Sequence, residues 1–144
     1  MKHDIVTIGS SDIDAFVKSK HFKVVKTGAF PTGFGECFSL GSKIELDHLL
    51  LSTGGGANNA ATTFSRLGFD TGCCTRVGKD FFGDYIAADL KKRNITPYVI
   101  EDPHGHTAFS TILLMPSGER TILVFRGATK NFSSKEFLKY NFEA

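Results

Sequence analysis

The sequence predicts an α/β fold in which a parallel sheet is flanked by helices and carries an antiparallel β excursion. Helix-like and strand-like segments alternate between residues 57 and 101, an order that implies right-handed crossovers and parallel strands. Residues 16–52 differ, because short alternating pieces are divided there by glycine and proline. That pattern is typical of antiparallel, partly exposed strands.

Composition supports one ordinary globular domain. The chain has 144 residues, of which 41% are apolar and 22% are charged, with 17 Lys+Arg against 15 Asp+Glu. A core of this size needs no disulfide or metal. The formal charge of +2 forms no basic stripe for a nucleic-acid backbone, and the apolar runs are far shorter than the roughly 20 residues of a membrane helix. We expect a soluble protein that binds neither nucleic acid nor membrane.

The chain start and the cysteines suggest where the protein works. Charged residues at the start lead directly into a strand-like run, with no visible secretory leader. Cys37, Cys73 and Cys74 are odd in number, and two of them are adjacent, which suits a reducing compartment better than a structural disulfide. We therefore expect a cytoplasmic location, with Cys73 and Cys74 as small packed residues on opposite faces of one strand.

The first predicted strand is the β-branched run at residues 4–9, which ends in glycine. A loop over residues 10–14 is expected to follow. The β excursion then contains three strand-like pieces, at residues 23–26, 35–40 and 43–46.

Two helices and a core strand follow the excursion. A glycine run opens a helix over residues 57–67, where apolar residues recur at helical spacing and Gly68 provides a C-terminal stop. Residues 70–77 predict a core strand. A second helix is expected over residues 81–93, with Asp80 as its N-cap and basic residues near its C-terminus.

The last third of the chain predicts a strand at residues 98–101 and a hairpin. The hairpin strands are residues 107–115 and 120–125, joined by a turn with proline and glycine. The tail over residues 131–144 resembles the start of a helix, capped by Ser133 or Ser134. A parallel sheet that stops after about three strands leaves an edge open, so we expect the chain to be incomplete.

The glycine run Gly54-Gly-Gly56 is the strongest local signal for a ligand. Glycines allow the backbone close to a ligand, and N–H groups at a helix start donate to oxygens. The run is not a dinucleotide fingerprint, because the spacing fails at Asn59. Gly78-Lys79 is not a phosphate loop either, since Cys73 holds the upstream glycine position and Asp80 replaces the Ser or Thr. Nucleotide phosphate at Gly54-Gly-Gly56 is disfavoured, because no lysine or arginine lies beside it.

Four segments resemble the PfkB (ribokinase-like) carbohydrate kinases. Gly54-Gly-Gly-Ala-Asn-Asn59-Ala-Ala61, followed at the family's spacing by Gly68 and Gly78, is similar to the N-terminal signature of that family, with Asn59 in register with its asparagine. Three other segments agree in order, namely Ile8-Gly-Ser-Ser-Asp-Ile-Asp14, Val77-Gly-Lys-Asp-Phe-Phe-Gly-Asp84, and Pro116-Ser-Gly-Glu-Arg-Thr-Ile122 leading to Arg126-Gly-Ala128. The resemblance covers essentially the whole chain.

This resemblance implies the N-terminal half of a ribokinase-like fold. A β lid would be formed by residues of about 16–52 and 107–125. It would project from an α/β core of about 1–15, 53–106 and 126–144. In the family this lid covers the acceptor and often pairs with a second subunit, so the resemblance implies a homodimer through the lid.

The activity implied by the resemblance is transfer of the γ-phosphoryl group of ATP, with Mg²⁺, to a hydroxyl of a sugar, a nucleoside or a related acceptor. The family's catalytic aspartate, in a Gly-Ala-Gly-Asp segment, and most of its ATP pocket belong to the other half of the domain. No such segment occurs in this sequence. We therefore expect no catalytic residue and no metal site here. A non-catalytic sugar-binding or dimerisation module is the alternative.

The resemblance also implies the acceptor-binding residues. Asp14 would bind acceptor hydroxyls with Asp12 nearby, and Gly54, Gly55 and Asn59 would contact the same acceptor. Short carboxylates and an amide suit a sugar, whose adjacent hydroxyls both donate and accept hydrogen bonds. Without the resemblance, the aspartates would be read as turn or capping residues and the asparagine as a helix-start residue.

A second polar cluster is less informative. Asp102, His104 and His106 lie in one turn, but their spacing matches no tetrahedral zinc pattern. We expect a solvated loop.

Overall fold

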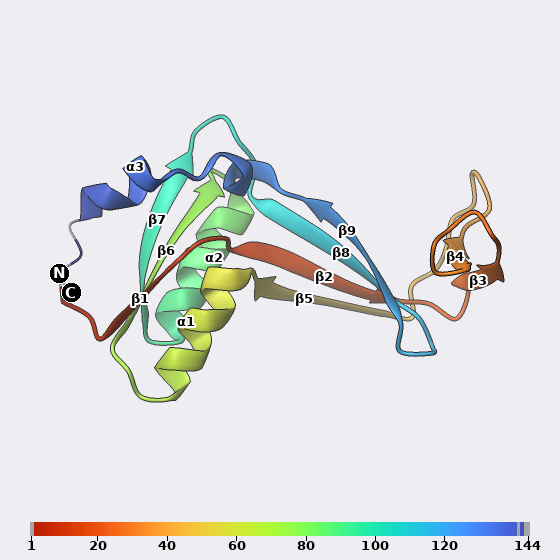
Figure 1. The fold of residues 1–144 in the computed structure, drawn as a ribbon, viewed down its shortest axis with the longest axis horizontal. Coiled ribbons are helices and arrows are strands. Elements are labelled where there is room, and N and C mark those ends of the chain that lie inside the picture. Colours follow the sequence, from red (N-terminus) through yellow and green to blue (C-terminus); the bar gives the residue numbers. More distant parts are fainter. Residues whose placement is uncertain (1, 141, 143–144) are drawn as a thin grey trace.

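A computed structural model describes residues 2–140 and 142. The α/β core holds three parallel strands in the order β1-β6-β7, namely β1 (Ile5–Ile8), β6 (Thr71–Gly78) and β7 (Ile95–Asp102). Helices α1 (Gly56–Arg66) and α2 (Phe81–Lys92) connect these strands and pack together against the sheet (Figure 1). The predicted parallel sheet with crossover helices is confirmed.

A second sheet projects from this core (Figure 1). Its strands are β2 (Asp12–Lys18), β5 (His48–Gly54), β8 (Ala108–Leu114) and β9 (Arg120–Phe125), in the order β5-β2-β8-β9. The outer pairs are antiparallel, but β2 and β8 are parallel, so the prediction of a wholly antiparallel lid is wrong at its centre. The reason is topological, because β2 and β8 both leave the core while β5 and β9 return to it.

The predicted loop over residues 10–14 is also wrong, since β2 already begins at Asp12. Aspartate is unfavourable in strands. However, Asp12 and Asp14 pair with β5 on one side and β8 on the other, and pairing on both sides outweighs that preference. Both aspartates are therefore held on a strand.

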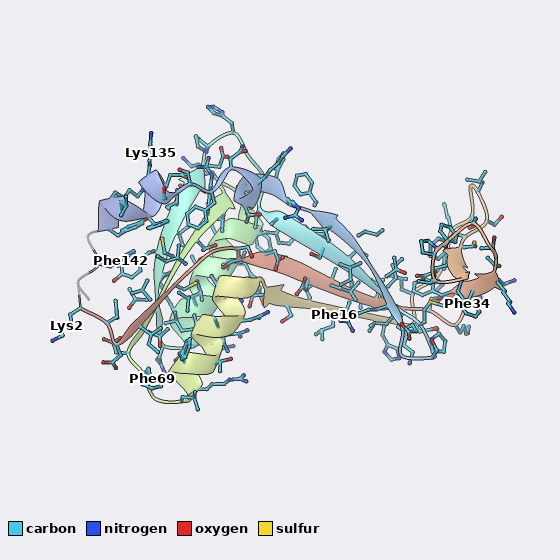
Figure 2. All side chains as sticks on the ribbon, viewed as in Figure 1. Lys2, Phe16, Phe34, Phe69, Lys135 and Phe142 are labelled. Carbon is cyan, nitrogen blue, oxygen red and sulfur yellow. The ribbon has the colours of Figure 1, made fainter. Side chains whose placement is uncertain are left out.

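The far end of the projecting sheet carries a small hairpin of β3 (Lys23–Lys26) and β4 (Phe34–Cys37), where Figure 2 labels Phe34. The strand predicted at residues 43–46 is not formed. Ile44 instead packs against a buried cluster around Val17, and the carbonyl of Glu45 accepts a hydrogen bond from Ser19.

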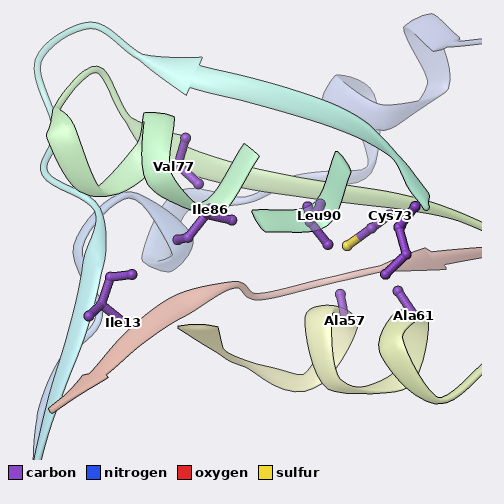
Figure 3. Close-up of a cluster of buried hydrophobic side chains, with 8 residues drawn as sticks. Ile13, Ala57, Ala61, Cys73, Val77, Ile86 and Leu90 are labelled. Atoms are coloured by element: carbon purple, nitrogen blue, oxygen red, sulfur yellow. The ribbon is translucent and has the colours of Figure 1, made fainter. Parts of the chain in front are cut away.

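The sheet of the core buries apolar side chains on both faces. Cys73 faces α1 and α2, whereas Cys74 faces Tyr98 and the aromatic side chains of the tail, so the predicted opposite orientation of the two cysteines is confirmed. Strand β6 is buried along its length, as expected. Strand β1 is only partly buried, because among the described residues it has a strand partner on one side only. Figure 3 shows the first cluster, which contains Ile13, Ala57, Ala61, Cys73, Val77, Ile86, Leu90 and Ile95.

The tail crosses the other face of the core sheet. It contains the 3-10 turns η1 (Gly127–Asn131) and η2 (Leu138–Tyr140) around the short helix α3 (Ser134–Phe137). Ser133 caps α3 in a capping box with Glu136, as predicted. The predicted continuation at residues 141, 143 and 144 lies outside the described residues. In the part of the chain that the structure describes, no helix is both long enough and apolar enough to span a bilayer.

Candidate functional site

Buried apolar residues alternate with polar residues at the start of strand β2. Ile13, Ala15 and Val17 are buried on one face, while Asp12 and Asp14 lie on the other and are partly exposed. Successive side chains of a strand point to opposite faces. Both carboxylates therefore share the face of the projecting sheet opposite to the core residues.

Gly54 provides the space that these two carboxylates occupy. It pairs with Asp12 across β2 and β5. A Cβ atom on Gly54 would lie 2.1 Å from Oδ2 of Asp14 and 2.7 Å from Oδ1 of Asp12. The structure thus brings three of the predicted site residues together, and only glycine fits beneath both acids.

Gly55 and Ser10 join the end of β1 to the start of α1. Gly55 has a φ of +94°, and a Cβ there would lie 2.5 Å from the carbonyl oxygen of Ser10. That carbonyl accepts a hydrogen bond from Ala57 N–H at 3.1 Å, and the Ser10 hydroxyl accepts one from Gly56 N–H at 3.2 Å. Gly55 therefore has a structural role that glycine alone can fill.

Asn59 lies in the first turns of α1 with its side chain exposed, and its N–H donates to the carbonyl of Gly55. Among the described residues, no hydrogen bond joins its amide to Asp12 or Asp14. Its neighbour Asn58 is fully buried, and neither its Oδ1 nor its Nδ2 has a partner within the described chain. The resemblance assigned an acceptor contact to Asn59 and no role to Asn58.

Burial makes both carboxylates reluctant to ionise. The pKa of Asp12 rises from 3.8 to about 6, because burial disfavours its charged form and the charge of Asp14 adds repulsion. Burial also raises the pKa of Asp14, against a hydrogen bond from the Ser110 hydroxyl that lowers it. Ser110 pairs with Asp14 across β2 and β8, and sequence reasoning missed it. Such a pair is suited to accept hydrogen bonds from ligand hydroxyls.

Replacing Asp12 by asparagine is expected to stabilise the protein above about pH 6. The folded state holds the Asp12 proton more tightly than the unfolded state, so stability falls as the pH rises from 3.8 to about 6 and then stays lower. Asp12→Asn removes this loss, and its thermal midpoint should exceed that of the parent at about pH 8 but match it near pH 4. Glu101→Gln, at an exposed carboxylate, is the control. A variant no more stable than the parent at the higher pH would contradict the argument.

Asp80 connects α2 to the root of β8. As predicted, it is the N-cap of α2, where its Oδ1 accepts a hydrogen bond from Gly83 N–H at 2.9 Å. The Asp80 carboxylate also accepts two hydrogen bonds from Thr107, one from its N–H at 2.8 Å and one from its hydroxyl at 2.6 Å. The Thr107 hydroxyl in turn accepts a hydrogen bond from Gly78 N–H. Although burial opposes it, these hydrogen bonds bring the pKa of Asp80 below its usual value. The 77–84 segment thus holds the projecting sheet to the core.

The turn that follows β7 leaves His104 and His106 exposed, as expected for a solvated loop. The carboxylate of Asp102 forms an ion pair with Arg76 at 2.8 Å, and Arg76 also pairs with Glu136. Asp102 accepts backbone hydrogen bonds from His104 and Gly105 as well. Within the described residues, no group of three or more His, Cys, Asp and Glu side chains is arranged to hold a metal ion.

Comparison with known proteins supports the sequence resemblance. The pfkB family carbohydrate kinase pattern matches residues 2–144. A ribokinase of Staphylococcus aureus (strain COL) is 27% identical over 141 residues, which are 96% of this chain and 41% of that protein. The chain thus spans about two fifths of the length of this relative.

Solved structures agree on the fold. The ribokinase of Giardia lamblia superposes with a TM-score of 0.75 at 25% identity, covering 94% of this chain and 39% of that one. An Arabidopsis thaliana ribokinase complexed with ribose and ATP gives a TM-score of 0.71 at 22% identity, with 89% of this chain and 37% of that one covered. These similarities confirm the predicted ribokinase-like fold. With the match over residues 2–144, they show that the chain belongs to the pfkB family of carbohydrate kinases.

Proposed function

We propose that this chain supplies the acceptor-binding loops and the lid of a kinase that phosphorylates a hydroxyl of a sugar or a related acceptor. The observation that carries the proposal is the pair of partly exposed carboxylates, Asp12 and Asp14, gathered over Gly54 on one face of the projecting sheet. Asp12 and Asp14 each keep part of their side chain open to a ligand, although Oδ1 of Asp12 is itself buried, without a hydrogen-bond partner within the described chain. Family membership supports the same acceptor class.

Each polar residue has a distinct role in this proposal. Asp14 accepts from one acceptor hydroxyl while the Ser110 hydroxyl holds its carboxylate in place. Asp12, two residues before Asp14 on β2, accepts a hydrogen bond from a second acceptor hydroxyl. Gly54 leaves room for the two carboxylates against the strand, and Asn59 offers an exposed amide from α1. Fixing two adjacent hydroxyls orients the acceptor, which is the main contribution a protein makes to phosphoryl transfer.

The start of α1 is not free to bind the phosphates of the donor, by inference ATP with Mg²⁺. The N–H groups of Gly56 and Ala57 at the start of α1 already donate to Ser10. No cluster of acids or histidines suited to a metal ion is present in the described ranges. We therefore assign the donor site and the catalytic base to the remainder of a full-length enzyme, and we expect the 144-residue chain alone to transfer no phosphate. A kinase assay on the purified chain tests this.

We also propose that the lid sheet pairs with a second copy of the chain, in the cytoplasm. Its outer strands expose apolar residues, including Leu49 and Leu50 on β5, both 62% exposed, and Leu123 on β9, 57% exposed. Apolar stretches of this kind are rarely left open to water. Sedimentation of the full-length protein tests the pairing. The unpaired Cys73 and Cys74 fit a reducing location.

In the full-length enzyme, Asp14→Asn is expected to weaken acceptor binding while leaving ATP affinity unchanged. Loss of a hydrogen bond to a charged acceptor costs about 1.5–3 kcal/mol, or roughly tenfold to a hundredfold in affinity. Separate calorimetric titrations with the acceptor and with ATP measure both effects. Asp84→Asn, at an exposed position on α2, should change neither. Equal weakening of both ligands would count against the assignment.

A further inference from the structure

The end of the projecting sheet farthest from the core carries an apolar surface that the proposed function does not use (Figure 1). Residues 23–43, which contain the β3–β4 hairpin and the turn after it, are called the tip below. Leu40 is 101% exposed, Phe34 55% and Phe30 49%, and three more of its apolar side chains are exposed, namely Val24, Val25 and Phe38. So many large apolar side chains on one small element mark a binding surface.

Two reverse turns of the tip each present an apolar residue to solvent. In the first turn, Gly33 N–H donates a hydrogen bond to the carbonyl of Phe30 at 2.9 Å. In the second turn, Ser42 N–H donates to the carbonyl of Ser39 at 3.2 Å, and Leu40 is the residue that follows Ser39. The two exposed side chains therefore stand where the backbone reverses, and contact with them does not disturb the strands.

The tip is held in place although these side chains are exposed. The ring of Phe38 packs edge-to-face on Phe22 with the centroids 5.5 Å apart, and Phe22 belongs to the buried cluster around Val17. The ring of Phe30 lies over Gly35, where a Cβ atom would clash with it. The exposed apolar side chains thus stand on a fixed scaffold.

The tip is also positively charged. It contains three lysines, Lys23, Lys26 and Lys43, against one acid, Glu36. The lysines are exposed, and within the described residues none of them forms an ion pair. Both carboxylate oxygens of Glu36 are buried. Lys26 pairs with Phe34 across β3 and β4, so that a cation and an aromatic ring share one face. The charge that the tip exposes is therefore positive.

We propose that the tip binds an anionic lipid surface. Phe30 and Leu40 enter the boundary between headgroups and acyl chains, and the lysines contact the headgroup charges. Exposed apolar side chains combined with lysines are the two components of peripheral membrane binding. The sequence argued against a membrane because its apolar runs are too short for a spanning helix, and two turns need no such run. The inference is independent of the proposed function, since it uses no residue of the acceptor site.

A second copy of the chain fits the tip less well. Pairing two tips would bring the lysines of both together, and like charges that face each other oppose association. The apolar side chains also form no single flat patch, because the neighbours Val24 and Val25 of β3 point to opposite faces of the hairpin. A fluid lipid surface can receive such a shape, whereas a rigid partner must match it.

Vesicle co-sedimentation of the full-length protein tests the proposal, with phosphatidylcholine alone and with phosphatidylcholine and phosphatidylserine in equal parts. The protein should partition onto the phosphatidylserine vesicles at low salt, and this partitioning should fall as salt increases. Phe30→Ser combined with Leu40→Ser should lower the partition coefficient at least about tenfold, because two inserted side chains are lost. Leu67→Ser, at a residue 69% exposed at the end of α1, is the matched control and should leave the coefficient unchanged.

A lysine variant tests the contribution of charge separately. Lys26→Gln should lower the partition coefficient about fivefold, since each lysine near an anionic surface contributes about that much. Lys92→Gln, at an exposed position at the end of α2, should not change it. Should the double serine variant fail to fold, Leu40→Ser alone keeps the test decisive, because a fully exposed side chain contributes no packing.

Three outcomes would overturn the proposal. The first is no binding to either kind of vesicle, and the second is equal binding to both kinds, which leaves no role for the lysines. The third is an unchanged partition coefficient in the Leu40→Ser variant. If the tip variants instead alter sedimentation of the protein without vesicles and leave vesicle binding unchanged, the tip is a contact between copies of the chain and the proposal fails.

Discussion

Gly54→Ala is expected to abolish acceptor binding in the full-length enzyme while leaving the protein folded. The added methyl group would lie 2.1 Å from Oδ2 of Asp14 and 2.7 Å from Oδ1 of Asp12, so both carboxylates must rotate away. The clash is with the ends of side chains and not with the backbone, so the fold can adapt. Loss of two charged hydrogen bonds at about 1.5–3 kcal/mol each predicts a decrease in affinity of roughly a hundredfold or more.

The measurement pairs acceptor titration with thermal unfolding. Gly28→Ala is the matched control, because a Cβ at Gly28 meets no atom within 4 Å and its φ is not in the left-handed region. The control should keep both affinity and thermal midpoint. If Gly54→Ala binds the acceptor within about threefold of the parent, the acids over Gly54 are not the acceptor site.

Local signals in the sequence were sufficient for much of the core. The spacing of Ala57 and Ala61, the N-cap Asp80 and the capping residue Ser133 each act within one helix, and the structure has all three as predicted. The composition of residues 70–77 likewise predicted the buried strand β6. Such features depend on neighbours a few residues away, which is why a single sequence reveals them.

The parts that sequence reasoning missed depend on contacts between distant segments. Strands β2 and β8 pair although their residues are some 96 positions apart in the chain. Whether they pair parallel or antiparallel depends on the direction in which each strand leaves the core. The same pairing brings Ser110 to Asp14 and turns the expected loop at Asp12 into a strand. No local pattern predicts these contacts. The low strand preference of aspartate is outweighed when the strand is paired on both sides.

The candidate site was predicted through family resemblance more than through physics. Asp12, Asp14 and Gly54 do converge in the structure, and Gly55 holds the adjoining turn, but the roles in acceptor binding remain predictions. The turn containing His104 and His106 is exposed, as the sequence predicted for a solvated loop.

Asp80→Ala is expected to cause the largest loss of stability among single changes where the projecting sheet joins the core. Loss of the α2 N-cap costs about 1 kcal/mol. The N–H and hydroxyl of Thr107, a residue only 3% exposed, would also lose their acceptor, which costs a further 1–3 kcal/mol or so. The total of roughly 3 kcal/mol should appear as a lower urea midpoint with an unchanged slope.

The pH dependence distinguishes this role from generic damage. The folded-state pKa of Asp80 lies below its ordinary value of 3.8, so its contribution is present above that pH and is lost as the pH falls through the folded pKa. The difference between parent and variant should therefore be constant near neutrality and shrink in acid. Asp84→Ala, one turn into α2 and exposed, should cost only a few tenths of a kcal/mol and serves as control. If the two variants unfold alike, Asp80 does not hold the projecting sheet to the core, because Asp80 and not Asp84 accepts the hydrogen bonds from Thr107.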